Sequence, residues 1–133
     1  MTTPNDIRAI LASALQFRYQ DAHLEIDVAD KLALLDSRQL RLTRKEYELL
    51  LLLVENAGEV VPREVLLMRV WGYGSGIRTR TLDVHIRRLR KQLGSYSARY
   101  IETIFGIGYR FQPFRASRRL QPEAGVSELA LSA

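Results

Sequence analysis

Hydrophobic and polar positions alternate along residues 17–42, which predicts short strands with one face in water. In LEIDV the apolar residues Leu24, Ile26 and Val28 alternate with acids, and RQLRL alternates in the same way. Polar pairs separate the four runs FRYQD, LEIDV, KLALLD and RQLRLT. The pattern favours a small antiparallel sheet.

The spacing becomes helical in residues 43–72. TRKE has the arrangement of a capping box, in which Thr43 and Glu46 satisfy each other's backbone N–H groups. The following YELLLLLVENAG is apolar on most faces and predicts a central core helix that ends at Gly58. A second helix, PREVLLMRVWG, is expected to have Pro62 in its first turn. The apolar side of that helix is expected to consist of Val65, Leu66, Met68, Val70 and Trp71.

A third helix is predicted from residue 79 or 80 to 93, between the Gly-rich loop 72–78 and Gly94. An apolar stripe at the spacing i, i+4, i+7, i+11 is formed by Leu82, Ile86, Leu89 and Leu93. A second row with the same spacing is formed one position earlier by Thr81, His85, Arg88 and Gln92. Val84 lies beside this row, which basic residues flank: Arg80, Arg87, Arg90 and Lys91.

The C-terminal part of the chain predicts a β-hairpin at 101–111, IETIFGIGYRF, with Gly106 and Gly108 at or near its turn. The SYSAR segment before it is expected to be a polar loop, and residues 113–133 a flexible tail. At the other end, residues 1–16 are interpreted as a linker or an extra amphipathic helix. The central domain is therefore expected to span 17–112.

Composition narrows the function classes. Twenty Lys and Arg residues against 15 Asp and Glu give a net charge of +5, which favours an anionic partner without naming one. The chain has no cysteine, so disulfides and Cys-based zinc sites are excluded. The longest apolar run, LLLLLV, is too short to span a bilayer, and the N-terminus lacks the pattern of a secretory signal. We expect a soluble, cytoplasmic protein with no membrane partner and no cofactor.

The two faces of the third helix suit a DNA major groove. Arg bonds guanine through two donors at once, and a small apolar side chain such as Val84 meets a thymine methyl. Flanking Arg and Lys hold phosphates on both walls of the groove. The alternative is a charged face that is merely solvated, but such a face usually carries compensating acids, and here only Asp83 is present.

The ordered set of segments resembles the winged helix-turn-helix effector domain of OmpR/PhoB-type response regulators. The matching segments run from about residue 24 to 111: LEID, LRLTRKEYELLLLL, GEVVPREVLLMRVWG, RTLDVHIRRLRKQL and IETIFGIGYRF. The resemblance implies an α+β fold with a four-stranded N-terminal antiparallel sheet, a three-helix bundle and a C-terminal hairpin, the wing. It also implies a transcriptional regulator of a two-component phosphorelay that binds double-stranded DNA.

The same resemblance assigns roles to residues. The third helix becomes the recognition helix, with base-facing positions at Val84, Arg88 and Thr81. Phosphate or backbone contacts are implied for Trp71, Arg80, His85, Arg87, Arg90, Lys91, Thr103 and Tyr109. The wing tip is implied at Phe105 and Gly106. A loop that touches RNA polymerase in some members corresponds to Gly72, Tyr73, Gly74 and Ser75. Members bind direct-repeat sites as head-to-tail pairs, so a homodimer on DNA is expected.

Two features depart from the family pattern. Many members carry Arg where this chain has Phe105, so minor-groove readout by a charge is not available. Phe105 is expected to pack inward or to contact sugar, rather than to intercalate. The phosphorylated receiver domain is also absent, because residues 1–23 are too few to form one. The chain is interpreted as either a fragment of a longer regulator or a natural regulator without a receiver, with a slight preference for the fragment.

Other function classes have less support. The two histidines, His23 and His85, do not make a metal site in a chain without cysteine. No nucleophile–base pair or carboxylate pair can be assembled, so an enzyme is not expected. The main alternative is a winged-helix docking module whose basic helix binds an acidic protein partner.

Overall fold

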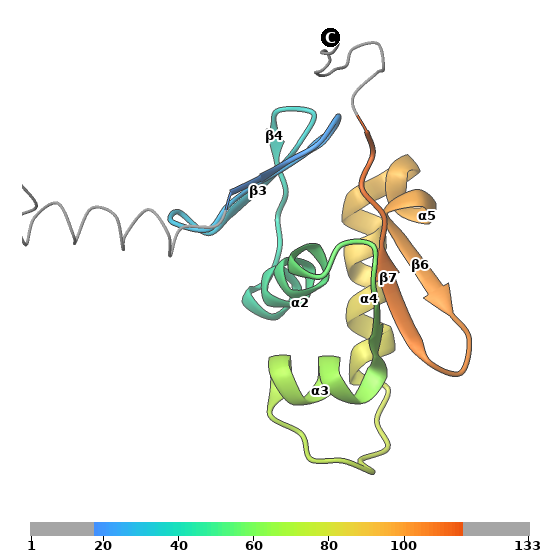
Figure 1. Cartoon of the computed structure of the whole chain (residues 1–133). Coiled ribbons are helices and arrows are strands. Elements are labelled where there is room, and N and C mark those ends of the chain that lie inside the picture. Colours follow the sequence, from blue (N-terminus) through green and yellow to red (C-terminus); the bar gives the residue numbers. More distant parts are fainter. Residues whose placement is uncertain (1–17, 116–133) are drawn as a thin grey trace, which may run out of the picture. The chain divides into compact units, whose positions relative to one another are not determined.

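The computed structural model describes residues 18–115, which form two compact units that meet in the sequence between Leu40 and Arg41. Figure 1 labels the helices and strands of both units. The segment of residues 1–16, interpreted from the sequence as a linker or an extra helix, lies outside the described residues. Among the described residues, no helix combines the length and apolar character needed to cross a membrane.

The first unit is the predicted four-stranded antiparallel sheet, and its strands follow the order β1-β2-β3-β4. Its strands are β1 (Arg18–Gln20), β2 (Leu24–Asp27), β3 (Leu32–Leu35) and β4 (Arg38–Gln39). Leu24 and Ile26 are buried and their neighbours are not, which confirms the alternation. Asp36 and Ser37 both have positive φ, as expected for the tight two-residue turn between β3 and β4. β4 is shorter than the predicted strand and stops before Leu40.

The second unit begins with α2 (Arg44–Glu55), whose start is the predicted capping box. The Glu46 amide donates to Thr43 Oγ1 at 3.2 Å, and the Thr43 amide donates to Glu46 Oε1 at 3.1 Å. Two of the four N–H groups that a helix start leaves unpaired are thereby satisfied. The leucines of α2 form the centre of the core, and α2 packs against both other long helices.

Residues 60–62 form the short strand β5 (Val60–Pro62), an element that the sequence did not predict. Pro62 is therefore the N-cap of α3 (Arg63–Trp71) and does not lie within its first turn. The predicted apolar side of α3 was also partly wrong. Leu66 and Val70 are buried as predicted, but Leu67 is buried in place of Met68, which is 53% exposed.

The recognition helix predicted from the sequence is α4 (Thr81–Leu93), and its apolar stripe is buried as expected. The segment after it is not a polar loop. It forms a 3-10 turn, η1 (Gly94–Tyr96), and the short helix α5 (Ser97–Tyr100). Tyr100 and Tyr47 are both buried. The ring of Tyr100 stacks on Phe111 with ring centroids 5.3 Å apart.

The C-terminal hairpin consists of β6 (Ile101–Ile104) and β7 (Gly108–Phe111), and β5 adds a third strand in the order β5-β7-β6. Gly106 lies in the turn with φ of +79°. Gly108 does not belong to the turn: it pairs with Pro62 in the sheet, where a Cβ atom would lie 2.0 Å from the Val61 carbonyl oxygen. Gly108 is thus required by the close approach of β5 to β7.

Ordered packing in the second unit continues past the predicted limit at residue 112. The Phe114 ring lies 4.7 Å from the Tyr100 ring and 5.4 Å from the Tyr96 ring, measured between centroids. The Arg99 guanidinium lies over the Phe114 ring at 4.2 Å. The beginning of the predicted flexible tail is therefore held against α5. The rest of that tail lies outside the described residues.

Candidate nucleic-acid interface

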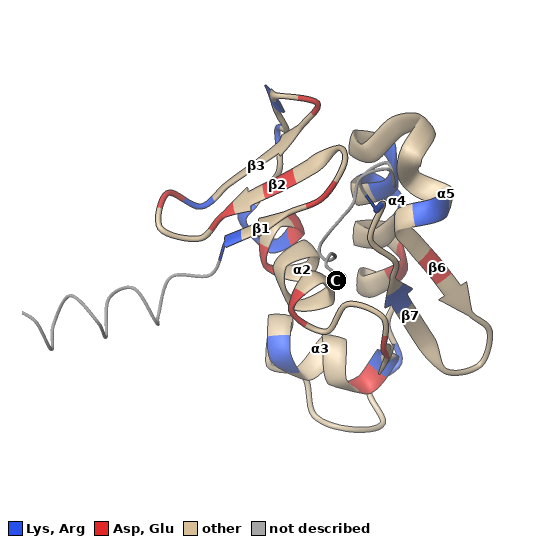
Figure 2. Ribbon diagram, turned by 45° about the horizontal axis from the view of Figure 1, so that its top comes forward, with Lys and Arg blue, Asp and Glu red and all other residues tan. Residues whose placement is uncertain are grey.

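The interface is built on the face of α4 that points away from the apolar stripe. Four cationic side chains are exposed on this face or at its start: Arg80, Arg87, Arg88 and Lys91. Val84 is half-buried and shares a face with Arg88, four residues further along the helix. Figure 2 marks the basic residues of α4 in blue. A helix about 10–12 Å wide with this surface has the dimensions of the major groove.

The row of four outward-facing residues predicted from the spacing was only partly right, because Arg88 is its one exposed member. Thr81 and Gln92 are half-buried and have partners within the protein. The Thr81 and Thr79 hydroxyl oxygens lie 2.8 Å apart, and Gln92 Oε1 accepts a hydrogen bond from the Arg41 amide at 3.2 Å. The true centre of the exposed face is therefore shifted toward Arg87 and Lys91.

His85 is placed between the backbone of its own helix and Trp71 at the end of α3. Its Nδ1 lies 2.8 Å from the carbonyl oxygen of Thr81. Its ring meets the Trp71 ring edge-on, with centroids 4.8 Å apart. A carbonyl oxygen only accepts hydrogen bonds, so Nδ1 must carry a proton and donate it. Trp71 and His85, both predicted to touch the DNA backbone, are thus brought together by the structure.

Arg90 and Thr103, two further predicted phosphate contacts, are bonded to each other. The Arg90 guanidinium donates to the Ile101 carbonyl oxygen and to Thr103 Oγ1, both at 2.8 Å. Arg90 also lies over the Tyr109 ring, 5.8 Å from its centroid. These bonds hold α4 against the first strand of the wing. The hydroxyl proton of Thr103 is still free to be donated, because Thr103 only accepts in this pair.

Tyr109 is buried on β7, and its hydroxyl donates to Asp83 Oδ1 at 2.9 Å. Asp83 also receives two bonds from Arg63, at 2.6 Å and 3.3 Å. The hydrogen bond from Arg63 is the main reason that the pKa of Asp83 is below its usual value, with partial burial acting against it. Burial, and then the Asp83 carboxylate, raises the pKa of Tyr109. Both groups therefore keep the protonation states that this bond needs.

The sequence singled out neither Asp83 nor Arg63 as a site residue. Asp83 is the one acid on α4, and an isolated acid on a basic helix was the signal that could have identified it. Its partner Arg63 could not be found in this way. It lies 20 residues earlier in the chain, and only the fold brings it to α4.

The wing tip presents apolar surface. Phe105 is 90% exposed, so of the two expected arrangements inward packing is wrong and the outward one remains. Ile107 is also exposed. Gly106 between them holds the positive φ that the turn requires. The wing tip of this chain therefore offers an apolar contact at the position where many members of the family resembled carry Arg.

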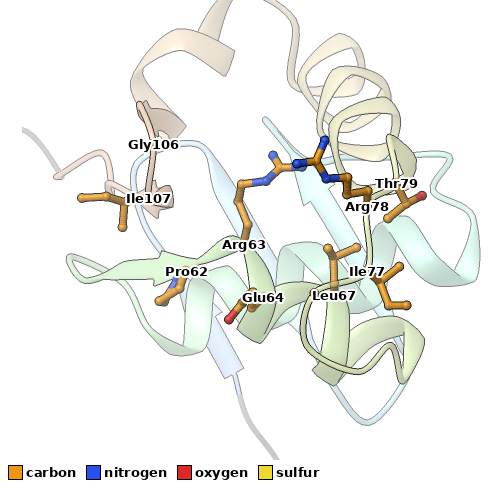
Figure 3. Close-up of a pocket in the computed structure, with 10 residues that line it drawn as sticks. Pro62, Arg63, Glu64, Leu67, Ile77, Arg78, Thr79, Gly106 and Ile107 are labelled. Carbon is orange, nitrogen blue, oxygen red and sulfur yellow. The ribbon is translucent and has the colours of Figure 1, made fainter.

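The loop that begins at Gly72 is anchored at its start and open further on. Gly72 adopts the left-handed conformation that ends α3, and the Tyr73 amide donates to the Leu67 carbonyl oxygen. Gly74 and Ser75 are exposed. Figure 3 shows the neighbouring hollow of about 680 Å³, which lies among the start of α3, residues 76–79 and the wing tip.

Metal chemistry finds no support in the part of the chain that the structure describes. No group of three or more His, Asp or Glu side chains with metal-binding geometry occurs among residues 18–115. What the described surface offers instead is cationic donors on one helix, beside a wing with hydroxyl and apolar groups. Such a surface suits an extended anion with a groove and a phosphate backbone.

The fold and this surface define a winged helix-turn-helix domain. The family model described as "Transcriptional regulatory protein, C terminal" matches residues 37–111, more than half of the chain. The chain therefore belongs to this family, the C-terminal effector domains of OmpR/PhoB-type response regulators. The resemblance predicted from the sequence motifs is thereby confirmed.

Individual relatives agree with the family. The chain is 43% identical over 93 residues to the transcriptional regulatory protein SrrA of Staphylococcus aureus, a match that spans 68% of this chain and 39% of SrrA. The chain thus corresponds to less than half the length of such relatives. The RstA DNA-binding domain of Klebsiella pneumoniae, solved with the RstA box, has a TM-score of 0.67 at 28% identity, covering 72% of this chain and 97% of that one.

A longer relative of known structure is the response regulator DrrB of Thermotoga maritima, described as an OmpR/PhoB homolog. It has a TM-score of 0.67 and 34% identity, and the match covers 84% of this chain and 55% of DrrB. The architecture predicted from the sequence, an N-terminal antiparallel sheet, three helices and a C-terminal hairpin, is the one these structures share.

Proposed function

We propose that this chain is a transcriptional regulator that binds a specific sequence of double-stranded DNA in the cytoplasm. The single observation that supports this most is the exposed face of α4, where Arg88 and Val84 lie together between Arg80, Arg87 and Lys91. Base-reading groups flanked by phosphate-binding groups are what a major-groove helix requires.

Within this function, the residues have different tasks. Arg88 and Val84 read bases, with Thr81 beside them at the start of α4. Arg80, Arg87 and Lys91 hold phosphates, and Thr103 donates its remaining hydroxyl proton. Arg90 and Tyr109 contribute mainly by fixing the wing, since Arg90 Nη2 and the Tyr109 hydroxyl already donate within the protein.

The wing completes the footprint. Phe105, at its exposed tip, contacts deoxyribose beside the minor groove, where an apolar ring loses no hydrogen bond. Head-to-tail pairs on direct-repeat sites, and contact of the loop Gly72–Ser75 with RNA polymerase, belong to the same proposal. Both rest on the family resemblance.

Duplex binding at several salt concentrations tests this function against the docking-module alternative. With ~5 phosphate contacts per subunit, log affinity against log salt should have a slope of about −4 to −5. A selected duplex should also bind more tightly than heparin, which offers charge without bases. Equal retention on heparin and on every duplex would contradict the proposal and favour an acidic protein partner.

A further inference from the structure

Asp83 is the one carboxylate on a helix that otherwise presents cations to its surroundings. Its side chain is 47% exposed, so burial does not explain its presence. An acid in the first turn does favour the helix dipole, but many positions in that turn would serve equally well. The bonds that Asp83 makes to other elements explain its position better.

The carboxylate of Asp83 joins three elements of the second unit. Oδ1 and Oδ2 receive the two Nη groups of Arg63, the first residue of α3. Oδ1 also receives the hydroxyl proton of Tyr109 on β7. Arg63 follows β5 directly, and β5 pairs with β7 through Val61 and Tyr109. Both partners of Asp83 are therefore attached to the sheet that contains the wing.

A second connection between α4 and this sheet lies seven residues further along the helix. There the Arg90 guanidinium donates to Ile101 and Thr103 of β6. Residues seven apart lie on the same side of a helix, about 10 Å from each other along its axis. Two connections on one side of α4, at this separation, restrict changes in the angle between the helix and the wing.

We propose that Asp83 is a positioning residue for DNA recognition: through Arg63 and Tyr109 it holds the recognition helix at the angle to the wing that one duplex can accommodate. This inference rests on the proposed DNA-binding function. Asp83 touches no base in this account. It contributes to discrimination between sequences, because only a correctly aimed helix lets Arg88 meet its base while the wing meets the backbone.

The direction in which DNA affinity changes when the charge of Asp83 is removed distinguishes a positioning role from a purely electrostatic one. Removing a negative charge next to a polyanion should strengthen binding to every duplex alike, by less repulsion. Loss of positioning should instead weaken binding to the preferred duplex and leave binding to a scrambled duplex the same or stronger. The ratio of the two affinities is thus the informative quantity.

The test compares the full chain with Asp83→Asn, which keeps the side-chain shape, and with Tyr109→Phe, which removes only the hydroxyl group. Glu102→Gln is the matched control. It also removes one acid, but Glu102 is bonded to Arg110 within the β6–β7 pair and not to α4. Circular dichroism and thermal unfolding establish that each variant is folded.

We expect Asp83→Asn to lower the ratio of preferred to scrambled affinity by roughly tenfold, the size typical of charge-assisted hydrogen bonds. Tyr109→Phe should lower it less, and Glu102→Gln should leave it unchanged. An unchanged ratio in both Asp83→Asn and Tyr109→Phe would overturn the proposal. If Asp83→Asn does not fold, an unchanged ratio in Tyr109→Phe is sufficient to overturn it.

A second measurement needs no DNA. Because the chain has no cysteine, spin labels can be attached to Phe105→Cys and Lys91→Cys without background. The distance distribution between wing tip and α4 should be narrow, should broaden with Asp83→Asn, and should stay narrow with Glu102→Gln. Identical distributions would overturn the proposal. If the unmodified chain prefers no duplex, the proposed function fails, and this distance still decides whether Asp83 holds the wing.

Discussion

Arg87 and Arg88 are neighbours in the sequence, but successive helical positions are about 100° apart, so their side chains have different tasks. Arg88→Ala should cost roughly 1–3 kcal/mol on the preferred site and relax the preference at one base pair. Arg87→Ala should weaken binding to all sequences alike and make the salt slope less steep by about 1. Titration of single-base-substituted duplexes measures both. Equal loss on every duplex for Arg88→Ala would contradict base reading.

His85 gives a prediction about the DNA backbone contact of Trp71. The His85 ring is held by the bond from Nδ1 to the Thr81 carbonyl oxygen and meets the Trp71 ring edge-on, with centroids 4.8 Å apart. His85→Ala removes this support, so affinity should fall by a similar factor on every duplex, because backbone contacts carry no sequence information.

The measurement for His85→Ala is its affinity for the preferred duplex and for a scrambled duplex, with His23→Ala as the control. His23, the other histidine of the chain, lies in the first unit beside Asp36. His23→Ala should leave both affinities unchanged. Unchanged affinities in His85→Ala would contradict a role of the Trp71–His85 pair at the DNA backbone.

At the scale of single residues, the sequence predicted what local chemistry determines. The Thr43–Glu46 capping box depends on residues three apart, and it formed as predicted. The bond of Arg90 to Thr103 and that of Arg63 to Asp83 join residues distant in sequence. The spacing of residues in the sequence does not predict the partners of such side chains. Side chains that are free to bind phosphate could therefore not be distinguished from those that bond within the protein.

At the scale of elements, the approach of β5 to β7 depends on Gly108. Gly108→Ala should destabilise the protein by about 2–4 kcal/mol, because its Cβ would lie 2.0 Å from a backbone oxygen that cannot move aside without breaking the sheet. Gly74→Ala is the control, since no atom lies within 4 Å of its added Cβ. Thermal and urea unfolding measure both. A Gly108 variant as stable as the Gly74 variant would contradict this packing.

The elements that could not be predicted from the sequence are those that depend on contacts with residues far away in the chain. Val60–Pro62 is too short to show a period, and it is a strand only because β7 lies beside it. The α5 turn has polar residues on most positions, and Tyr100 is buried by Phe111 and Phe114 from later in the chain. By contrast, α2 and α4 were predicted well, because long helices carry their burial pattern in local sequence.

At the scale of the whole molecule, acid should weaken the fold. Arg63 holds the pKa of Asp83 below its usual value, and Arg110 does the same for Glu102. A carboxyl whose pKa is lower in the folded state adds stability above its unfolded pKa, near 4, and loses it as the pH falls through the folded value. The melting temperature should therefore fall when the pH is lowered below about 4. In Asp83→Asn the melting temperature should fall less over the same pH range. If the melting temperatures of both proteins fell equally with pH, Asp83 would not be the group responsible.

The overall architecture was predictable because five segments occur in a fixed order with the family's spacings, and the family was confirmed over residues 37–111. The central claim, that α4 reads a DNA sequence, is tested most directly by selection from a random duplex library at near-physiological salt. Enriched direct repeats spaced by about one helical turn, lost with Arg88→Ala, are the predicted result. Strong binding without any enriched sequence would contradict the claim, because the helix would then hold the backbone without reading it.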